Sequence, residues 1–485
     1  MNKLYNYLAK RGSFPTLITV LSSFIVALII GDLSAIELFC ILCIVSLQFY
    51  LNLYNRVYSS LIPVEELNKK NTLKSKLYFQ KINWILSVSP LLLVINIYMP
   101  WLVFFAVISL EIRAILHILQ RFYQKEKILI SESKKLEELN PKIAVYVSGL
   151  EDVAYQINQW LPVLKELDQS VIIVVRQRGI YKGMHETEIP IIYAKNAIHV
   201  EQVLDVGIKT VLYPANPMQN LIALRHYKLN HYFINHGESD KAVNQNKLLL
   251  AYDKLLVGGP LAHRRMTDAG LKLRGDQVEY VGRPQAEMLL NKIDSTKIKK
   301  IKTILYAPTW EGFVEDMNYS SVSNFGLRIL KDLSSLEYRL IFKPHPYTGS
   351  RNNEMRAYLE KIIAFCNKNG IEVVDSLVSI HHCMNQSDLL ITDISSVLNE
   401  YLVTNKAMIL CNVKAQSIEN LNQEFPSSRA AYVLNPEDKV QQLLENIKQK
   451  DDLKEQRLQI RVDSLGDPSI SALERFKEVI SRSCQ

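Results

Sequence analysis

Polar residues follow several short apolar segments of this 485-residue chain, at the places where strands of a parallel sheet would end. They form five clusters: His236-Gly237, Gly282-Arg283-Pro284, Pro308-Thr309-Trp310-Glu311, Lys343-Pro344-His345-Pro346 and Thr392-Asp393-Ile394-Ser395-Ser396. In open α/β sheets, ligands bind beyond the carboxyl ends of the strands. Cationic side chains and hydroxyls gathered there can hold a phosphate group, and a histidine can move a proton.

The serine pair gives the clearest physical signal. Ser395 and Ser396 precede an expected helix over 397–404, and the free N–H groups of its first turn would attract an anion. A plain helix cap is the commoner use of serine at such a place. Both interpretations stay open on the residues alone.

The other clusters allow similar alternatives. Lys343 and His345 lie on a proline-rich loop and offer two donors that suit a diphosphate, or the loop is simply solvated. Arg283 either clamps a phosphate or lies on the surface. His236 is a structural histidine or, since the glycine after it lets backbone approach closely, a functional one.

Several other chemistries lack their sequence motifs. The chain has no P-loop, no G-x-G-x-x-G, no G-x-S-x-G and no H-E-x-x-H, which argues against the nucleotide loops, the hydrolase elbow and the zinc site that these motifs form. His381 and His382 are adjacent and would diverge by about 100° on a helix, so they make a poor metal pair. We predict no protein metal site.

Short β-branched segments alternate with helical ones from residue 142 onward, which predicts parallel sheets built from β-α-β units. The pattern pauses at the basic stretch 295–302 and then restarts. We therefore expect an α/β lobe over 142–290 and a second over 302–485, the latter with a closing helical tail near 466–483. Two such lobes form a cleft between them.

Four apolar segments precede the lobes, at 14–30, 35–53, 83–99 and 101–119. Their lengths are near the roughly 20 residues that span a bilayer, although a buried helical bundle would also contain such segments. Basic residues fall on alternate loops, which predicts two hairpins with both ends in the cytoplasm. The sequence thus predicts a membrane domain with about four transmembrane helices over 1–120, a linker helix over 121–141 and a multi-pass protein of the bacterial cytoplasmic membrane.

Four motifs, "NHGESDK", "YAPTW", "FKPHP" and "DLLITDISSVLNEYL", occur in this order within about residues 210–420. Together they resemble the CDP-glycerol glycerophosphotransferases of teichoic-acid and capsule synthesis. The resemblance implies a GT-B-type fold, here a GT-B-like pair of Rossmann-type lobes preceded by the N-terminal helical membrane domain. It also implies transfer of a glycerol-phosphate or related polyol-phosphate unit from a CDP-activated donor, with release of CMP.

The resemblance also implies roles for individual residues. His236 matches the histidine that acts as the base on the acceptor hydroxyl, and His345 matches one near the donor diphosphate. Donor-binding roles fall on residues in the matched motifs, together with an arginine proposed from its position: Ser395, Ser396, Asp393, Lys343, Thr309 and Arg283. A phosphate-transfer step needs such donors, because charge develops on the phosphoryl oxygens and on the leaving group.

One motif departs from the family. Many members read H-G-T-P-x-K, whereas this chain has Glu238, Ser239, Asp240 and Lys241 after the glycine. A first alternative is therefore a GT-B glycosyltransferase that uses a CMP- or UDP-sugar, with Glu238 or Asp240 as its base. A second is a non-catalytic membrane scaffold of a polymer-assembly complex.

The expected partners follow from this interpretation. They are a CDP-activated polyol such as CDP-glycerol, a lipid-linked glycan or polyol-phosphate acceptor, and the membrane. A divalent cation bound through the diphosphate would leave little trace in the sequence. The net charge of +8 is too small and too dispersed for a nucleic-acid binder. Six cysteines without zinc-type spacing indicate a reducing compartment.

Overall fold

The computed structural model describes most of the chain from residue 134 onward and short stretches before it. The described residues are 34–43, 65–66, 95, 99, 101–109, 112–113, 115–116, 134–240, 246–290, 300–312, 315, 318–376 and 378–485. The chain divides into two compact units, one of residues 1–140 and 191–206 and the other of residues 141–190 and 207–485. All residues that the sequence assigns to the site belong to the second unit.

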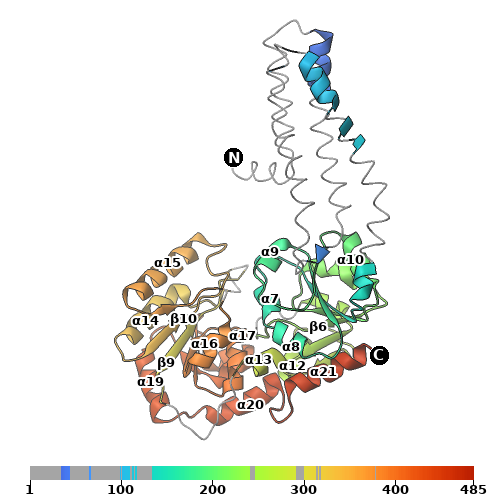
Figure 1. Cartoon of the computed structure of the whole chain (residues 1–485). Coiled ribbons are helices and arrows are strands. Elements are labelled where there is room, and N and C mark those ends of the chain that lie inside the picture. Colours follow the sequence, from blue (N-terminus) through green and yellow to red (C-terminus); the bar gives the residue numbers. More distant parts are fainter. Residues whose placement is uncertain are drawn as a thin grey trace. The chain divides into compact units, whose positions relative to one another are not determined.

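The first lobe of the second unit is built on a parallel sheet (Figure 1). Its strands lie in the order β3-β2-β5-β6-β7-β8. Their bounds are β2 (Ile143–Val147), β3 (Val171–Val175), β5 (Thr210–Tyr213), β6 (Asn230–Phe233), β7 (Lys254–Val257) and β8 (Val278–Tyr280). The central strands β2 and β5 are buried along their whole length, as expected for a parallel sheet with both faces covered.

Short helices connect these strands. They are α7 (Tyr155–Asn158), α8 (Leu161–Lys165), α9 (Arg178–Lys182), η2 (Met218–Asn220), α11 (Leu221–Leu224), η4 (Lys247–Ala251), α12 (Pro260–Asp268) and α13 (Pro284–Leu289). Proline stands in the first turn of α8, α12 and α13, where its missing N–H costs no hydrogen bond.

The second lobe repeats this architecture. Its strands lie in the order β11-β10-β9-β12-β13-β14 and every pairing is parallel. They are β9 (Thr303–Ala307), β10 (Arg339–Phe342), β11 (Glu372–Val373), β12 (Leu389–Thr392), β13 (Met408–Cys411) and β14 (Tyr432–Leu434). The helices are η6 (Val322–Gly326), α14 (Leu327–Ser334), α15 (Asn353–Lys368), α16 (Ile380–Gln386), α17 (Ser396–Tyr401), η7 (Leu402–Thr404), α18 (Ile418–Glu424), η8 (Pro426–Ala430) and α19 (Val440–Gln449).

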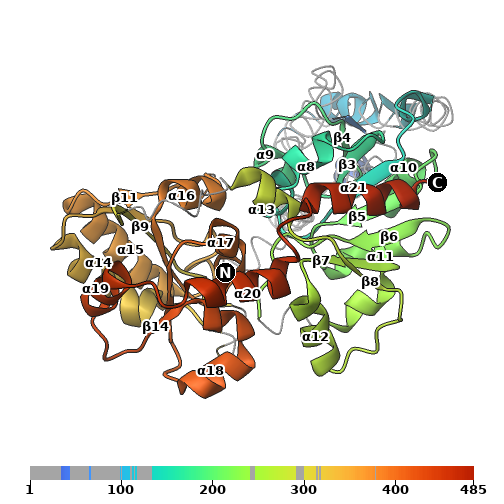
Figure 2. The ribbon, with the colours of Figure 1, turned by 90° about the horizontal axis from the view of Figure 1, so that it is seen from below.

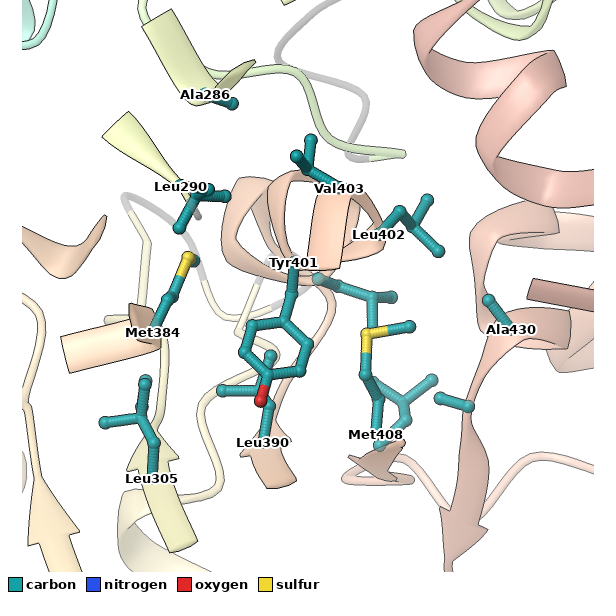
Figure 3. Close-up of a cluster of buried hydrophobic side chains, with 14 of the residues drawn as sticks. Ala286, Leu290, Leu305, Met384, Leu390, Tyr401, Leu402, Val403, Met408 and Ala430 are labelled. Carbon is teal, nitrogen blue, oxygen red and sulfur yellow. The ribbon is translucent and has the colours of Figure 1, made fainter. Parts of the chain in front are cut away.

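One hydrophobic core joins the two lobes. Tyr401 lies at the centre of the side chains drawn in Figure 3, with Leu390 and Met384 of the second lobe beside it. The same cluster includes Ala286 and Leu290, which belong to the α13 segment of the first lobe. The lobes are therefore held together by buried apolar contacts as well as by the polar contacts described below.

The C-terminal tail crosses back to the first lobe. Helices α20 (Lys454–Leu465) and α21 (Ala472–Ser483) run from the second lobe to the first sheet, in red in Figure 2. The Thr210 hydroxyl at the start of β5 donates to the Ser483 carbonyl (3.0 Å). Phe476 is fully buried, and its ring centroid lies 5.3 Å from that of Trp160.

The other unit is described in part. Strand β1 (Glu65–Glu66) pairs antiparallel with β4 (Ile191–Tyr193), and α10 (Ala197–Leu204) follows. Helical residues within 35–43 and 101–109 pack together through a small buried cluster of Cys40, Ile41, Val103 and Val107.

The predicted fold class is correct for the GT-B-like pair of α/β lobes and wrong for the membrane domain. Within the described part of the chain, no helix combines the length and the apolar character needed to cross a membrane. This finding also overturns the predicted multi-pass localisation. The predicted segment 14–30, and most of 35–53 and 83–99, lie outside the described residues.

The tail helix should contribute strongly to the stability of the first lobe. Replacing Phe476 by alanine removes a fully buried ring and should lower the free energy of unfolding by about 3–5 kcal/mol. Ile470→Ala is the matched control, because Ile470 lies on the same tail and is 53% exposed. Urea unfolding followed by circular dichroism measures both; equal midpoints for the two variants would contradict this role of the tail.

Candidate active site

His236 lies on a tight turn directly after β6. Asn235 before it adopts a left-handed conformation (φ 50°), which asparagine tolerates better than most residues. The Nδ1–H of His236 donates to the Pro214 carbonyl (2.9 Å). In the neutral ring this bond leaves Nε2 without a proton, so Nε2 is the atom that can accept one.

Burial keeps His236 neutral. It lowers the pKa of the imidazole from 6.5 to about 4, against the raising effect of the Pro214 carbonyl; nearby Arg283 lowers it further and Glu400 raises it. The ring is therefore an unprotonated base at neutral pH in the ligand-free protein.

His345 lies on the loop after β10 and has the opposite proton arrangement. Its Nδ1 accepts from the backbone N–H of Tyr347 (3.1 Å), so Nε2 carries the proton in the neutral ring. Trp310 stacks on the imidazole, with ring centroids 6.1 Å apart and an interplanar angle of 20°. His345 can thus donate a hydrogen bond where His236 can accept one.

Tyr155 of α7 brings the two histidines together across the lobes. Its ring centroid lies 5.7 Å from that of His236 and 6.2 Å from that of His345, edge-on to both. A hydrogen bond between the Tyr347 hydroxyl and Asp152 (2.9 Å) ties the same loop to the first lobe. One acceptor nitrogen and one donor nitrogen are therefore placed around a single aromatic ring.

Two further contacts hold the His345 loop. Glu311 is buried, and both of its carboxylate oxygens accept from the Gly349 N–H (3.1 Å each). Lys343 is also buried and donates to the Asp375 carbonyl (2.6 Å). Burial lowers the pKa of the Lys343 ammonium.

The serine pair stands at the start of α17, as predicted. Ser395 is extended and its side chain makes no capping hydrogen bond. Its hydroxyl oxygen is buried and has no partner among the described residues. The plain helix-cap interpretation therefore does not account for Ser395.

The glycine after His236 packs directly against this serine pair. A Cβ added to Gly237 would lie 2.8 Å from both Cβ and Oγ of Ser396, closer than real Cβ contacts allow. Only glycine lets the histidine turn of the first lobe approach the serine pair of the second so closely.

Asp393 and Thr309, both predicted to bind the donor, are buried side chains. Asp393 is fully buried and accepts from the backbone N–H groups of Thr309 (2.8 Å) and Ser321 (3.1 Å). Its carboxylate therefore ties the ends of two neighbouring strands together, behind the serine pair. We interpret both residues as supports of the site.

Arg283 is buried at the start of α13 and reaches across to the second lobe. Its guanidinium lies 3.6 Å from one carboxylate oxygen of Glu400, whose other oxygen pairs with His381 Nε2 (2.7 Å). Burial alone would raise the pKa of Glu400, but His381 and Arg283 hold it below its usual value. This charged group lies beside the Gly237 turn, since a Cβ there would be 3.7 Å from Glu400.

The two carboxylates after Gly237, those of Glu238 and Asp240, make hydrogen bonds and an ion pair within the fold. Glu238 accepts from the Gly258 N–H (2.7 Å), and burial raises its pKa against the lowering effect of Arg283. Asp240 pairs with Arg265 and accepts from the Ser427 N–H (2.9 Å). Neither side chain is placed as an accessible base. Lys241 lies outside the described residues.

The sequence analysis missed three contributors to this site. Tyr155 lies in an ordinary helical segment. Glu400 gave no sequence signal because its partner Arg283 is more than a hundred residues away, and His381 was considered only as a possible metal ligand beside His382. Among the described residues, no group of three or more His, Cys, Asp or Glu side chains could hold a metal ion.

These features define a GT-B-like α/β transferase with its candidate site between two lobes. The family model described as "CDP-Glycerol:Poly(glycerophosphate) glycerophosphotransferase" matches residues 224–465. Through these residues the chain belongs to that family, which confirms the resemblance found in the sequence. It is a CDP-glycerol glycerophosphotransferase-like transferase of polymer synthesis.

Several solved structures are similar over most of the chain. The wall teichoic acid polymerase TagF is 15% identical, covers 77% of this chain and 97% of its own, and has a TM-score of 0.49. The S. aureus MnaA–UDP structure is 15% identical, with coverages of 70% and 96% and a TM-score of 0.48. A Rickettsia africae glycosyltransferase is 13% identical, with coverages of 71% and 99% and a TM-score of 0.43. No curated protein matches.

The Gly237 contact yields a test of the lobe packing. Gly237→Ala places a methyl group 2.8 Å from Ser396 and should cost about 1–3 kcal/mol of stability through overpacking. Gly275→Ala is the control, since nothing lies within 4 Å of its Cβ position. Differential scanning calorimetry should show a lower melting temperature for the first variant alone. An unchanged melting temperature in Gly237→Ala would mean that the two lobes do not approach here.

Proposed function

We propose that this enzyme moves a glycerol-phosphate, or a related polyol-phosphate, from a CDP-activated donor to a hydroxyl of a lipid-linked or polymeric glycan acceptor. The observation that supports this most strongly is the pair of histidines around Tyr155. They come from opposite lobes and present an unprotonated Nε2 and a protonated Nε2. Transfer of a phosphoryl group to a hydroxyl is accelerated by one group of each kind, a base for the hydroxyl proton and a donor to the oxygens on which charge develops.

His236 is the proposed base. The acceptor hydroxyl oxygen attacks the phosphorus that carries the glycerol, and its proton passes to Nε2 of His236. The bond from this phosphorus to the bridging oxygen breaks, and CMP leaves with the electron pair. Because the donor diphosphate is negative, its binding would raise the pKa of His236 and make the ring a better proton acceptor.

The second lobe would hold the donor. His345 Nε2–H is the proposed hydrogen-bond donor to the diphosphate, where charge develops as CMP leaves. The free hydroxyl of Ser395 and the N–H groups beside Ser396 would bind phosphate oxygens, with Lys343 and Arg283 supplying positive charge. A divalent cation on the diphosphate remains part of this proposal, brought by the donor rather than by a protein metal site.

The sugar-transfer alternative is less well supported. It needs Glu238 or Asp240 as the base, yet the first is bound to the Gly258 N–H and the second to Arg265 and Ser427. We therefore retain His236 as the base.

Replacing His236 should remove turnover while leaving donor binding intact. His236→Ala should lower kcat by about 10²- to 10⁴-fold, the usual contribution of a general base. The dissociation constant for CDP-glycerol should change little, because His236 acts on the acceptor hydroxyl. His185→Ala is the control, since His185 is an exposed histidine of the same lobe. CMP release and calorimetric binding measure the two quantities; near-normal turnover in His236→Ala would eliminate it as the base.

The pH dependence tests the same residue independently. A base must be unprotonated, so kcat/KM falls as pH drops through the pKa of the free enzyme. With the pKa of His236 at about 4, kcat/KM should stay level from neutral pH to about 5. An acidic limb centred near 6.5, the ordinary histidine value, would contradict the lowered pKa of His236.

The pH dependence of the free energy of unfolding checks the lowered pKa of His236 without an activity assay. The unfolded chain protonates His236 near pH 6.5 and the folded chain only near 4, so this residue destabilises the fold as pH falls through that interval. His236→Asn should remove this part of the pH dependence, which urea unfolding at pH 7 and pH 5 would measure.

A further inference from the structure

A separate cavity lies where α13, α20 and α21 come together. Three of its lining side chains are arginines, Arg283, Arg461 and Arg475, whereas neither His236 nor His345 lines it. The proposed function assigns no role to Arg461, Arg475 or the cavity.

The Arg475 side chain packs against two glycines, Gly282 and Gly466, which have no side chains to keep it away. A Cβ on Gly282 would lie 2.7 Å from its Nη2, and one on Gly466 would lie 3.1 Å away. Its Nη1 donates to the Asp467 carbonyl (3.3 Å), while its buried Nε has no hydrogen-bond partner among the described residues. The guanidinium therefore keeps unused hydrogen-bonding capacity beside the cavity.

The two acidic residues of the lining are engaged by backbone. Glu287 accepts from the Ala472 N–H (2.6 Å), and Asp467 accepts from the Ser469 N–H (2.8 Å). Among the described residues, Arg461 makes no hydrogen bond or ion pair, although Glu287 lies close enough to favour its charge. Burial lowers the pKa of Arg461, against the raising effect of Glu287.

We propose that Arg461 and Arg475 form a second phosphate-binding site, distinct from the site of the donor diphosphate. Guanidinium groups bind phosphate oxygens in pairs, and a half-buried arginine gains most from such a partner. This inference rests on the proposed function, because the ligand would be a phosphate of the acceptor. An acceptor built of phosphodiester repeats would place one of its phosphates here while the enzyme extends the end of the acceptor chain. Free inorganic phosphate offers the same chemistry.

Arg283 connects this cavity to the candidate active site. It lines the cavity, and its guanidinium also faces Glu400 beside the Gly237 turn. Arg283 would therefore lie between a phosphate bound by Arg461 and Arg475 and the turn that carries His236. This is a suitable place to hold an acceptor chain.

The test is calorimetric titration of the purified full-length chain with a synthetic glycerol-phosphate trimer and, separately, with inorganic phosphate. The variants are Arg461→Gln and Arg475→Gln. The control is Arg482→Gln, because Arg482 lies on α21 and is largely exposed. We expect the trimer to bind the wild type and to bind each cavity variant roughly tenfold more weakly, the change that corresponds to one hydrogen bond to a charged group. Arg482→Gln should bind as the wild type does.

A kinetic measurement separates ligand binding from a structural role. In CMP-release assays the two cavity variants should raise KM for the trimer about tenfold with kcat nearly unchanged, whereas a folding defect would lower the amount of active enzyme and leave KM as it is. If Arg475→Gln does not fold, Arg461→Gln alone tests the proposal, since Arg461 makes no hydrogen bond within the described part of the chain.

The outcomes are distinct. Trimer binding that is equal in the wild type and both cavity variants overturns the site. Arginine-dependent binding of inorganic phosphate without trimer binding overturns the acceptor as the ligand. Arginine-dependent trimer binding in a protein that releases no CMP from CDP-glycerol would support the site and contradict the proposed function, so the two claims fail separately.

Discussion

The close contact between Gly237 and Ser396 is the constraint on which the arrangement of the site depends. It sets how near the histidine turn of the first lobe comes to the serine pair of the second, and a side chain at position 237 would collide there. The surrounding structure supports this contact from both sides. The Trp160 indole N–H donates to the Asn235 carbonyl just before the turn (2.8 Å), and the tail helix packs Phe476 against the same indole. The returning tail thus helps to fix the turn that carries His236 as well as to close the fold.

The proposed chemistry rests on the backbone partners of two histidines. A carbonyl acceptor at Nδ1 of His236 and an N–H donor at Nδ1 of His345 give the rings opposite proton arrangements. No side-chain carboxylate is needed to set either one. The carboxylates nearby have other tasks: Glu238 and Asp240 take part in packing, and Glu400 balances the charge of Arg283. This division of labour explains how the departure of this chain from the family motif after the glycine is compatible with phosphate transfer.

Much of the two-lobe α/β architecture could be predicted from sequence, because buried parallel strands are short β-branched segments and polar candidate residues follow their ends. The residues missed, such as Tyr155 and Glu400, act through partners that are distant in sequence, so local patterns contain no trace of them. Position alone also leaves the role of Asp393 open: it follows a strand, as ligand-binding residues do, and the structure shows its buried carboxylate accepting from the Thr309 N–H. The membrane domain was predicted from the length of apolar segments alone, and among the described residues no helix is both long and apolar enough to cross a membrane.

The central claim is that the two lobes form one site for a CDP-activated polyol. The most direct test is to give the purified full-length protein CDP-glycerol, CDP-ribitol, a CMP-sugar and a UDP-sugar in parallel, each with a lipid-linked glycan acceptor, and to measure nucleotide release. We predict CMP release from a CDP-polyol and none from either sugar donor. Release of CMP from the CMP-sugar, or of UDP from the UDP-sugar, would contradict the account and make the enzyme a glycosyltransferase.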